Sequence, residues 1–72
     1  MPFRREVRLS GEKSLAFRSA LGVPIMQATR TQVLAVARTI WPEASLSDEA
    51  ESIYLGDVRV SFDKAGRVVD VS

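Results

Sequence analysis

The chain has 72 residues, of which 46% are hydrophobic and 26% are charged, and its formal net charge is +1. This length allows one domain at most, and the composition is that of a globular protein, which excludes a disordered chain. There is no cysteine and no histidine, which excludes a disulfide framework and the common zinc ligand sets. Because we find no targeting segment and no apolar run of about 20 residues, we expect a cytoplasmic protein that does not span a membrane.

The N-terminal part of the chain predicts one strand and one short helix. Polar and apolar residues alternate over residues 3–10, which is typical of a half-buried strand. Residues 12–21 predict a helix, because Gly22 followed by Pro24 is a common way for a helix to end. Residues 23–28 then form a connector, whose apolar side chains we expect in the core.

Residues 30–41 predict the main helix. Thr29 is a favourable N-cap, Gln32 three residues later completes a capping box, and Pro42 ends the helix. The apolar positions recur at helical spacing as Val33, Leu34, Val36, Ala37, Ile40 and Trp41. We therefore expect this helix to pack on the rest of the domain along that stripe.

The remainder of the chain predicts an acidic loop and then three strands. Residues 43–52 are mostly polar and acidic, and residues 53–55 begin a strand. After residue 55 the apolar side chains move from odd-numbered to even-numbered positions. This change requires either a bulge or a tight two-residue turn at 56–57, and we favour the turn. A hairpin follows over residues 58–71.

Two registers are open for this hairpin. A three-residue loop pairs Val60 with Asp70 and mixes apolar with polar side chains on each face. A four-residue loop over residues 63–66 pairs Arg59 with Asp70 instead. The valines that it places toward the helices are Val58, Val60, Val69 and Val71. Because a buried apolar face fixes register, we favour the four-residue loop.

In chain order these elements predict a single α+β domain over residues 1–72. The order is β-α-α-β-β-β, with two helices packed on one face of a small antiparallel sheet that ends in a meander. A core this small often provides too little stability on its own, and self-association would add to it.

The sequence contains no catalytic arrangement. Without histidine or cysteine the serines lack a base, and nothing marks Lys13 or Lys64 as buried, as a serine–lysine pair requires. Asp57 and Asp63 fit turns and Asp70 fits a cross-strand pair, so each has a structural role. The acidic loop lacks the ligand spacing of a calcium site. We therefore expect no enzyme, no metal, no cofactor and no small-molecule substrate.

The charges are divided unevenly along the chain. Residues 1–42 carry a net charge of +5 and residues 43–72 a net charge of −4. We expect the two halves to attract one another, within the fold or between subunits. The alternative is a nucleic-acid-associated regulator, which contacts phosphates through a helix-turn-helix of residues 12–21 and 30–41 or through a looser basic surface. The residues that would carry this alternative are Arg4, Arg5, Arg8, Lys13, Arg18, Arg30 and Arg38.

Residues 61–69 read Ser-Phe-Asp-Lys-Ala-Gly-Arg-Val-Val and follow a helix and a strand. This latter half of the chain resembles the helix and F-D-x-x-G-R-V hairpin of small two-helix, three-strand modules such as the outer-membrane lipoprotein SmpA/BamE group. The motif is mostly turn chemistry. The lipoprotein cysteine and signal segment of that group are absent here, so the resemblance implies no function.

Our leading hypothesis is a small non-enzymatic protein–protein interaction module, accessory, regulatory or inhibitor-like, that self-associates as a homodimer. Exposed sheet edges would offer unpaired backbone groups to another chain. The candidate contact residues are Tyr54, Arg59 and Trp41. Tyrosine and tryptophan are enriched at interface hot spots, and Trp41 also fits the core.

Overall fold

A computed structural model describes residues 6–72. Its elements are β1 (Glu6–Leu9), the 3-10 turn η1 (Gly11–Lys13), α1 (Ser14–Leu21), the 3-10 turn η2 (Ile25–Gln27), α2 (Arg30–Ile40), β2 (Ser52–Leu55), β3 (Val58–Phe62) and β4 (Val68–Val71). The predicted α+β class and element order are confirmed. The start of the predicted first strand, residues 3–5, lies outside the described residues, and with it Arg4 and Arg5.

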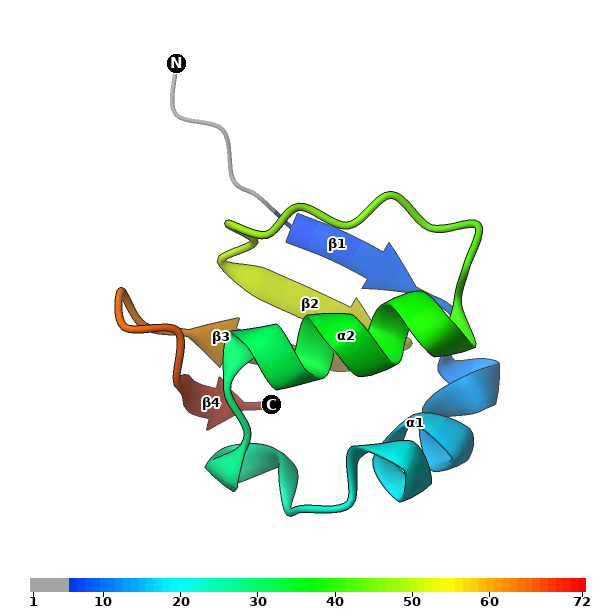
Figure 1. The fold of residues 1–72 in the computed structure, drawn as a ribbon, viewed down its shortest axis with the longest axis horizontal. Coiled ribbons are helices and arrows are strands. Elements are labelled where there is room, and N and C mark those ends of the chain that lie inside the picture. The colour runs from blue at the N-terminus through cyan, green and yellow to red at the C-terminus, as the bar shows by residue number, and fades with distance from the viewer. Residues whose placement is uncertain (1–5) are drawn as a thin grey trace.

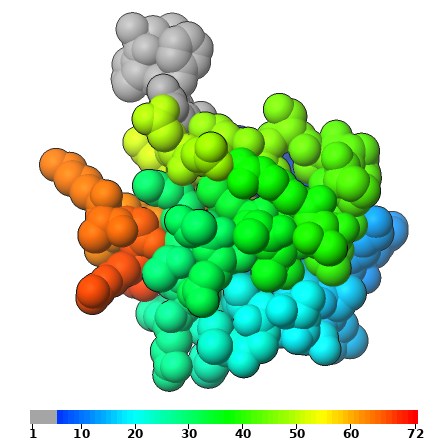
Figure 2. Space-filling model, in the orientation of Figure 1, coloured from blue at the N-terminus to red at the C-terminus, as the bar shows by residue number. Residues whose placement is uncertain are grey.

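The helices and the sheet form two layers. The strands lie in the order β1-β2-β3-β4, and α2 lies across one face of them, with α1 on the same side (Figure 1). In the space-filling view this side is filled by the helices and their connections, and the β3–β4 loop extends beyond them (Figure 2). No described helix lies on the opposite face of the sheet, which we call the outer face.

The sheet is mixed, which corrects the expectation of a wholly antiparallel sheet. β1 and β2 run parallel, whereas the β2–β3 and β3–β4 pairs are antiparallel. The reason lies in residues 41–51, which run back along α2 before β2 begins (Figure 1). The sequence predicts only a local loop there. Because this segment runs back along the whole of α2, β2 enters the sheet in the same direction as β1.

This return segment is attached to the helical layer along its length. Ala50 is fully buried, and Ala44 and Leu46, which are partly buried, pack against the core. The Arg38 guanidinium donates to the Leu46 carbonyl (3.3 Å) and forms an ion pair with Asp48. The ion pair joins the basic N-terminal half of the chain to the acidic C-terminal half.

The predicted helix caps are present. Thr29 Oγ1 accepts from the Gln32 N–H (3.3 Å), and Gln32 Oε1 accepts from the Thr29 N–H (3.0 Å), so the capping box of α2 is confirmed. α2 ends at Ile40, whose carbonyl accepts from Lys13 Nζ (3.1 Å). α1 ends at Gly22, which adopts a left-handed φ of 74°.

The tight turn predicted at residues 56–57 is also confirmed. Gly56 has a φ of 65°, and its N–H donates to the Leu9 carbonyl (2.9 Å). The backbone of Gly11 passes so close that a Cβ on Gly56 would lie 3.0 Å from the Gly11 Cα. This turn therefore requires glycine twice over, for its φ and for the close approach.

The β3–β4 loop is shorter than predicted. The Gly66 N–H donates to the Asp63 carbonyl (3.0 Å), and the Asp63 N–H donates to the Arg67 carbonyl (2.9 Å). The Asp63 carboxylate in turn accepts from the Arg67 N–H (2.9 Å). These bonds close a three-residue loop in which Gly66, at a φ of 81°, takes the left-handed position. The four-residue loop favoured from the sequence is wrong.

A bulge then restores the apolar face that a three-residue loop would break. Phe62 pairs with Val68. The next residue of β4, Val69, has no partner on β3, so Val60 pairs with Val71. The extra residue is Val69, which is 53% exposed, while Val68 is buried. A bulge inserts one residue into one strand, so both pairs keep their apolar side chains toward the helices. The predicted inward place of Val69 is therefore also wrong.

The shifted register changes the cross-strand partners. Arg59 is hydrogen-bonded through its backbone to Ser72, with bonds of 2.7 and 3.0 Å. Asp70 lies opposite Ser61. The predicted Arg59–Asp70 pair is therefore wrong, because the shorter loop and the bulge each move Asp70 by one position along β3, from Arg59 to Ser61.

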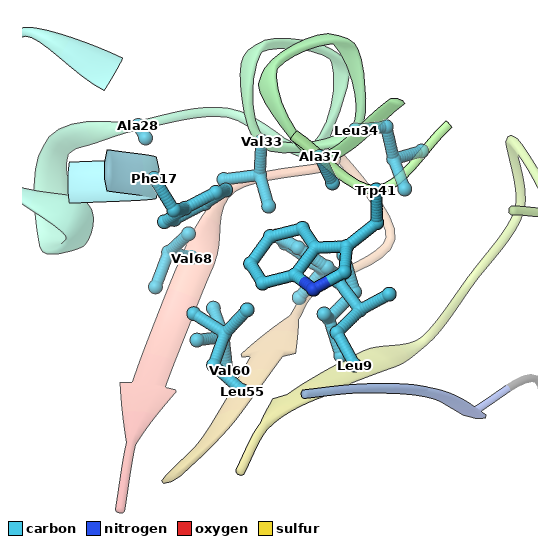
Figure 3. Close-up of a cluster of buried hydrophobic side chains, with 12 residues drawn as sticks. Leu9, Phe17, Ala28, Val33, Leu34, Ala37, Trp41, Leu55, Val60 and Val68 are labelled. Carbon is cyan, nitrogen blue, oxygen red and sulfur yellow. The ribbon is translucent and has the colours of Figure 1, made fainter. Parts of the chain in front are cut away.

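The core lies between the helical layer and the sheet. Phe17 of α1, Val33 of α2, Ile53 of β2 and Val60 of β3 are fully buried. Trp41 is 3% exposed, and its indole ring lies among the side chains of Phe17, Val33 and Val60, with its centroid 6.0 Å from that of Phe17 (Figure 3). Its Nε1 donor has no hydrogen-bond partner among the described residues. Both helices and the sheet thus share one core.

Candidate interaction surface

The strand pairing sorts the sheet's side chains onto two faces, because successive residues of a strand point in opposite directions. The inward residues are apolar and mostly buried. The outer face carries two rows of cross-strand neighbours. The first row, from β1 to β4, is Glu6, Ser52, Ser61 and Asp70. The second row is Arg8, Tyr54, Arg59 and Ser72.

The second row is a basic strip centred on Tyr54. The Arg8 guanidinium carbon lies 4.4 Å from the centroid of the Tyr54 ring, and Arg59 is the neighbour of Tyr54 on the other side. Tyr54 is half-buried, while both arginines are exposed. A guanidinium over an aromatic face is attracted by the ring and keeps its charge at the surface. The strip therefore combines an aromatic base with exposed positive charge.

The first row places negative charge at both edges of the sheet. Glu6 stands on β1 and Asp70 on β4, and these are the two edge strands. Ser52 and Ser61 lie between them as direct cross-strand neighbours. Two residues along a strand span roughly 7 Å, which separates the acidic row from the basic strip.

An open hollow of about 540 Å³ adjoins the first row. It is lined by side chains of both charges and by Ser52 and Ser61. Lys64, which also lines it, is exposed, so its ammonium is solvated and does not provide either serine with a desolvated amine as base. Within residues 6–72 no cluster of three or more acidic side chains is placed to hold a metal ion. The hollow thus offers polar contacts.

Two of the three predicted contact residues come together, and the third does not. Tyr54 and Arg59 are cross-strand neighbours on the outer face. Trp41 lies in the core, where its ring is surrounded by Phe17, Val33 and Val60 (Figure 3). Because Trp41 is buried, it has the core role that the sequence also allowed, and its interpretation as an interface residue is corrected.

The basic residues that would carry the nucleic-acid alternative are dispersed, as far as the structure describes them. Arg8 lies on the outer face, whereas Arg18 is exposed on α1 in the other layer. Lys13 donates to the end of α2, and Arg38 pairs with the return segment. Arg30 packs its guanidinium near Gly66 at the hairpin loop. These side chains do not form one continuous surface for a phosphate backbone.

The two helices also lack the geometry of a helix-turn-helix. Residues 22–29 separate α1 from α2 and include η2, whereas the motif uses a turn of about 3–4 residues. α2 packs on the sheet through Val33, Leu34 and Ala37. Its position is that of a core helix.

Sequence reasoning did not single out Glu6 and Ser61 as residues of the outer face, nor Ser52, which lies between them and is buried. Alternation over residues 3–10 already places Glu6 and Arg8 on one face of the first strand. The missing information is which strand lies beside it, because only the parallel β1–β2 pairing brings Arg8 against Tyr54.

The edge strands are less available than the sequence suggests. Residues 28–30 cover the start of β4 through two backbone hydrogen bonds to residues 66–68, of 2.6 and 3.4 Å. At the other edge, the described part of β1 is four residues long and carries Glu6 and Arg8. Short, charged edges are poor templates for strand addition. The outer face is therefore the better candidate for contact with a partner.

No helix formed by residues 6–72 is long and apolar enough to cross a membrane. The likeness of residues 61–69 to a lipoprotein hairpin is accounted for by the three-residue loop that Asp63 and Gly66 close.

No family model, no curated protein and no solved structure matches this chain.

Proposed function

We propose that this protein is a non-enzymatic module that binds another protein through the outer face of its sheet, in the cytoplasm. The observation that supports this is the division of that face into an acidic row and the basic strip of Arg8, Tyr54 and Arg59. Tyrosine and arginine are enriched at protein interfaces. Separate rows of opposite charge favour one orientation of a partner over others. The serines of this face have no histidine or desolvated lysine to act as base, which supports a binding role.

The same face is better suited to a protein than to a nucleic acid. A nucleic acid requires positive potential along its phosphates and free aromatic faces for its bases. Here Glu6 and Asp70 add negative charge at both edges, and Arg8 covers the Tyr54 ring. We therefore expect no salt-sensitive binding of DNA or RNA at low salt. Such binding would favour the nucleic-acid alternative.

Site-specific photocrosslinking tests this proposal. A benzophenone amino acid replaces Ser72, at a corner of the outer face, and in a matched control it replaces Ser19, an exposed serine of α1. The purified protein is irradiated in an extract of its source cells. We expect protein adducts from position 72 and far fewer from position 19. Equal labelling from the two positions, or no adduct from position 72, would contradict a role for the outer face.

A further inference from the structure

The outer face is complementary to a rotated copy of itself. A two-fold axis that lies in the face and runs across the strands reverses strand direction but keeps the order β1 to β4. The first row of one copy then lies over the second row of the other. Glu6 of each copy meets Arg8 of the other copy, and the pair is made twice.

The other contacts of this arrangement are also compatible. Arg59 of one copy lies over Ser61 of the other, with Asp70 as the next neighbour along the row. Tyr54 lies over Ser52, a small and buried side chain that leaves room for the ring. Each cation of the strip therefore meets a hydroxyl or a carboxylate.

The second way to stack two such faces is unfavourable. A two-fold axis parallel to the strands lays each row over itself and exchanges β1 with β4. Glu6 of one copy would then meet Asp70 of the other, which places like charges together. The charge pattern selects the axis that runs across the strands.

We propose that the occupant of the outer face is a second copy of this chain, in a two-fold dimer whose facing strands run antiparallel. This inference rests on the proposed function, because it names the partner of the same face. An isologous contact needs one self-complementary patch, and two-fold dimers are the commonest soluble oligomers. Pairing would also give this small domain a second layer over its open sheet.

The small size of the face indicates a weak dimer. Four strands about 4.8 Å apart, with about four residues of ~3.3 Å each, give a face of roughly 250 Å² on each copy. A total of about 500 Å² is below the ~1,200–2,000 Å² that stable complexes bury. We therefore expect a weak, reversible dimer, with a dissociation constant on the order of 100 μM or above.

Charge reversal at one contact tests the inference. Glu6→Arg leaves two cations at each Glu6–Arg8 contact, and Arg8→Glu leaves two carboxylates. In sedimentation velocity up to about 1 mM, where a 100 μM dimer predominates, wild type should show a monomer–dimer equilibrium. Each variant alone should associate at least tenfold more weakly. An equimolar mixture of the two variants should regain association, because the cations of one meet the carboxylates of the other. An unfolded variant would not give this rescue.

The matched controls are Arg18→Glu and Glu43→Arg, which make the same charge changes on exposed residues outside the outer face. They should dimerise like wild type, alone and mixed. A monomeric wild type, a mixture no stronger than its components, or stronger association of Glu6→Arg would overturn the inference. The crosslinks from position 72 separate the two claims. Adducts with a different protein would leave the proposed function standing without the dimer, and the loss of all adducts would remove both.

Discussion

The guanidinium of Arg8 lies over the ring of Tyr54, 4.4 Å from its centroid, and so joins β1 to β2 on the outer face. No described helix covers this ring. The exposed cation shields one side of the aromatic surface while its charge stays available to a partner. The contact therefore has two roles, one in stability and one in preparing the face for binding.

A double-mutant cycle measures the stability role. Arg8→Ala, Tyr54→Leu and the double variant are unfolded in urea at low protein concentration, where the monomer predominates. We expect a coupling of about 0.5–1 kcal/mol, the usual range of an exposed cation–π pair. The same cycle between Arg59 and Tyr54 is the control and should give a smaller coupling. Zero coupling for Arg8 with Tyr54 would contradict the stack.

The turn at Gly56 predicts different costs for two glycine substitutions. Gly22→Ala adds a Cβ where nothing lies within 4 Å, so it costs only the left-handed backbone strain of about 1–2 kcal/mol. Gly56→Ala has the same strain and also brings its Cβ to 3.0 Å from the Gly11 Cα. We expect it to cost at least about 1 kcal/mol more than Gly22→Ala in urea unfolding. Equal costs would mean that the two backbones do not approach so closely.

The bulge in β4 predicts opposite tolerance at adjacent valines. Val68 is 6% exposed and Val69 is 53% exposed. Val68→Lys buries an unpaired charge and should cost about 3 kcal/mol or more in thermal or urea unfolding. Val69→Lys should change stability by no more than about 0.5 kcal/mol. The reverse order of costs would support the four-residue loop and its unbulged register.

The buried indole predicts a large difference between two substitutions at Trp41. Trp41→Ala leaves a cavity and should cost about 3–5 kcal/mol, which is enough to unfold much of so small a domain. Trp41→Phe keeps most of the apolar contact and removes an Nε1 donor that has no partner among the described residues. We expect its cost to stay below about 2 kcal/mol in far-UV circular dichroism melts. Equal costs for the two variants would contradict this account of the ring.

The features that the sequence predicted correctly depend on neighbours along the chain. The capping box of Thr29 and Gln32 involves residues three apart, and Gly22 and Gly56 adopt the left-handed φ that their positions require. Such signals act over a few residues, so one sequence is sufficient to read them.

The features that the sequence did not predict depend on pairings between distant segments. The parallel β1–β2 pairing follows from the path of residues 41–51 back along α2. The polar sequence of this segment does not distinguish such a path from a local loop. The bulge at Val69 reconciles a three-residue loop with an apolar inner face, and sequence reasoning compared only unbulged registers. Both outcomes are decided by the packing of the whole sheet.

The candidate site was predictable only in part for the same reason. Tyr54 and Arg59 come from one hairpin, so their proximity follows from the turn at residues 56–57. Arg8 and Glu6 reach the same face only through the parallel pairing. The division of the face into rows of opposite charge therefore becomes visible only once all four strands are placed.

A concentration series of amide NMR spectra tests the central claim, that the outer face is the binding surface and that it binds a second copy. As the protein is diluted from about 1 mM to about 20 μM, across the expected dissociation constant, amide shifts should change for residues of the two rows, with Arg8, Tyr54 and Ser61 foremost. The exposed residues of α1, such as Leu15, should stay constant. Shifts that are independent of concentration, or that change on α1 and not on the sheet, would contradict the account.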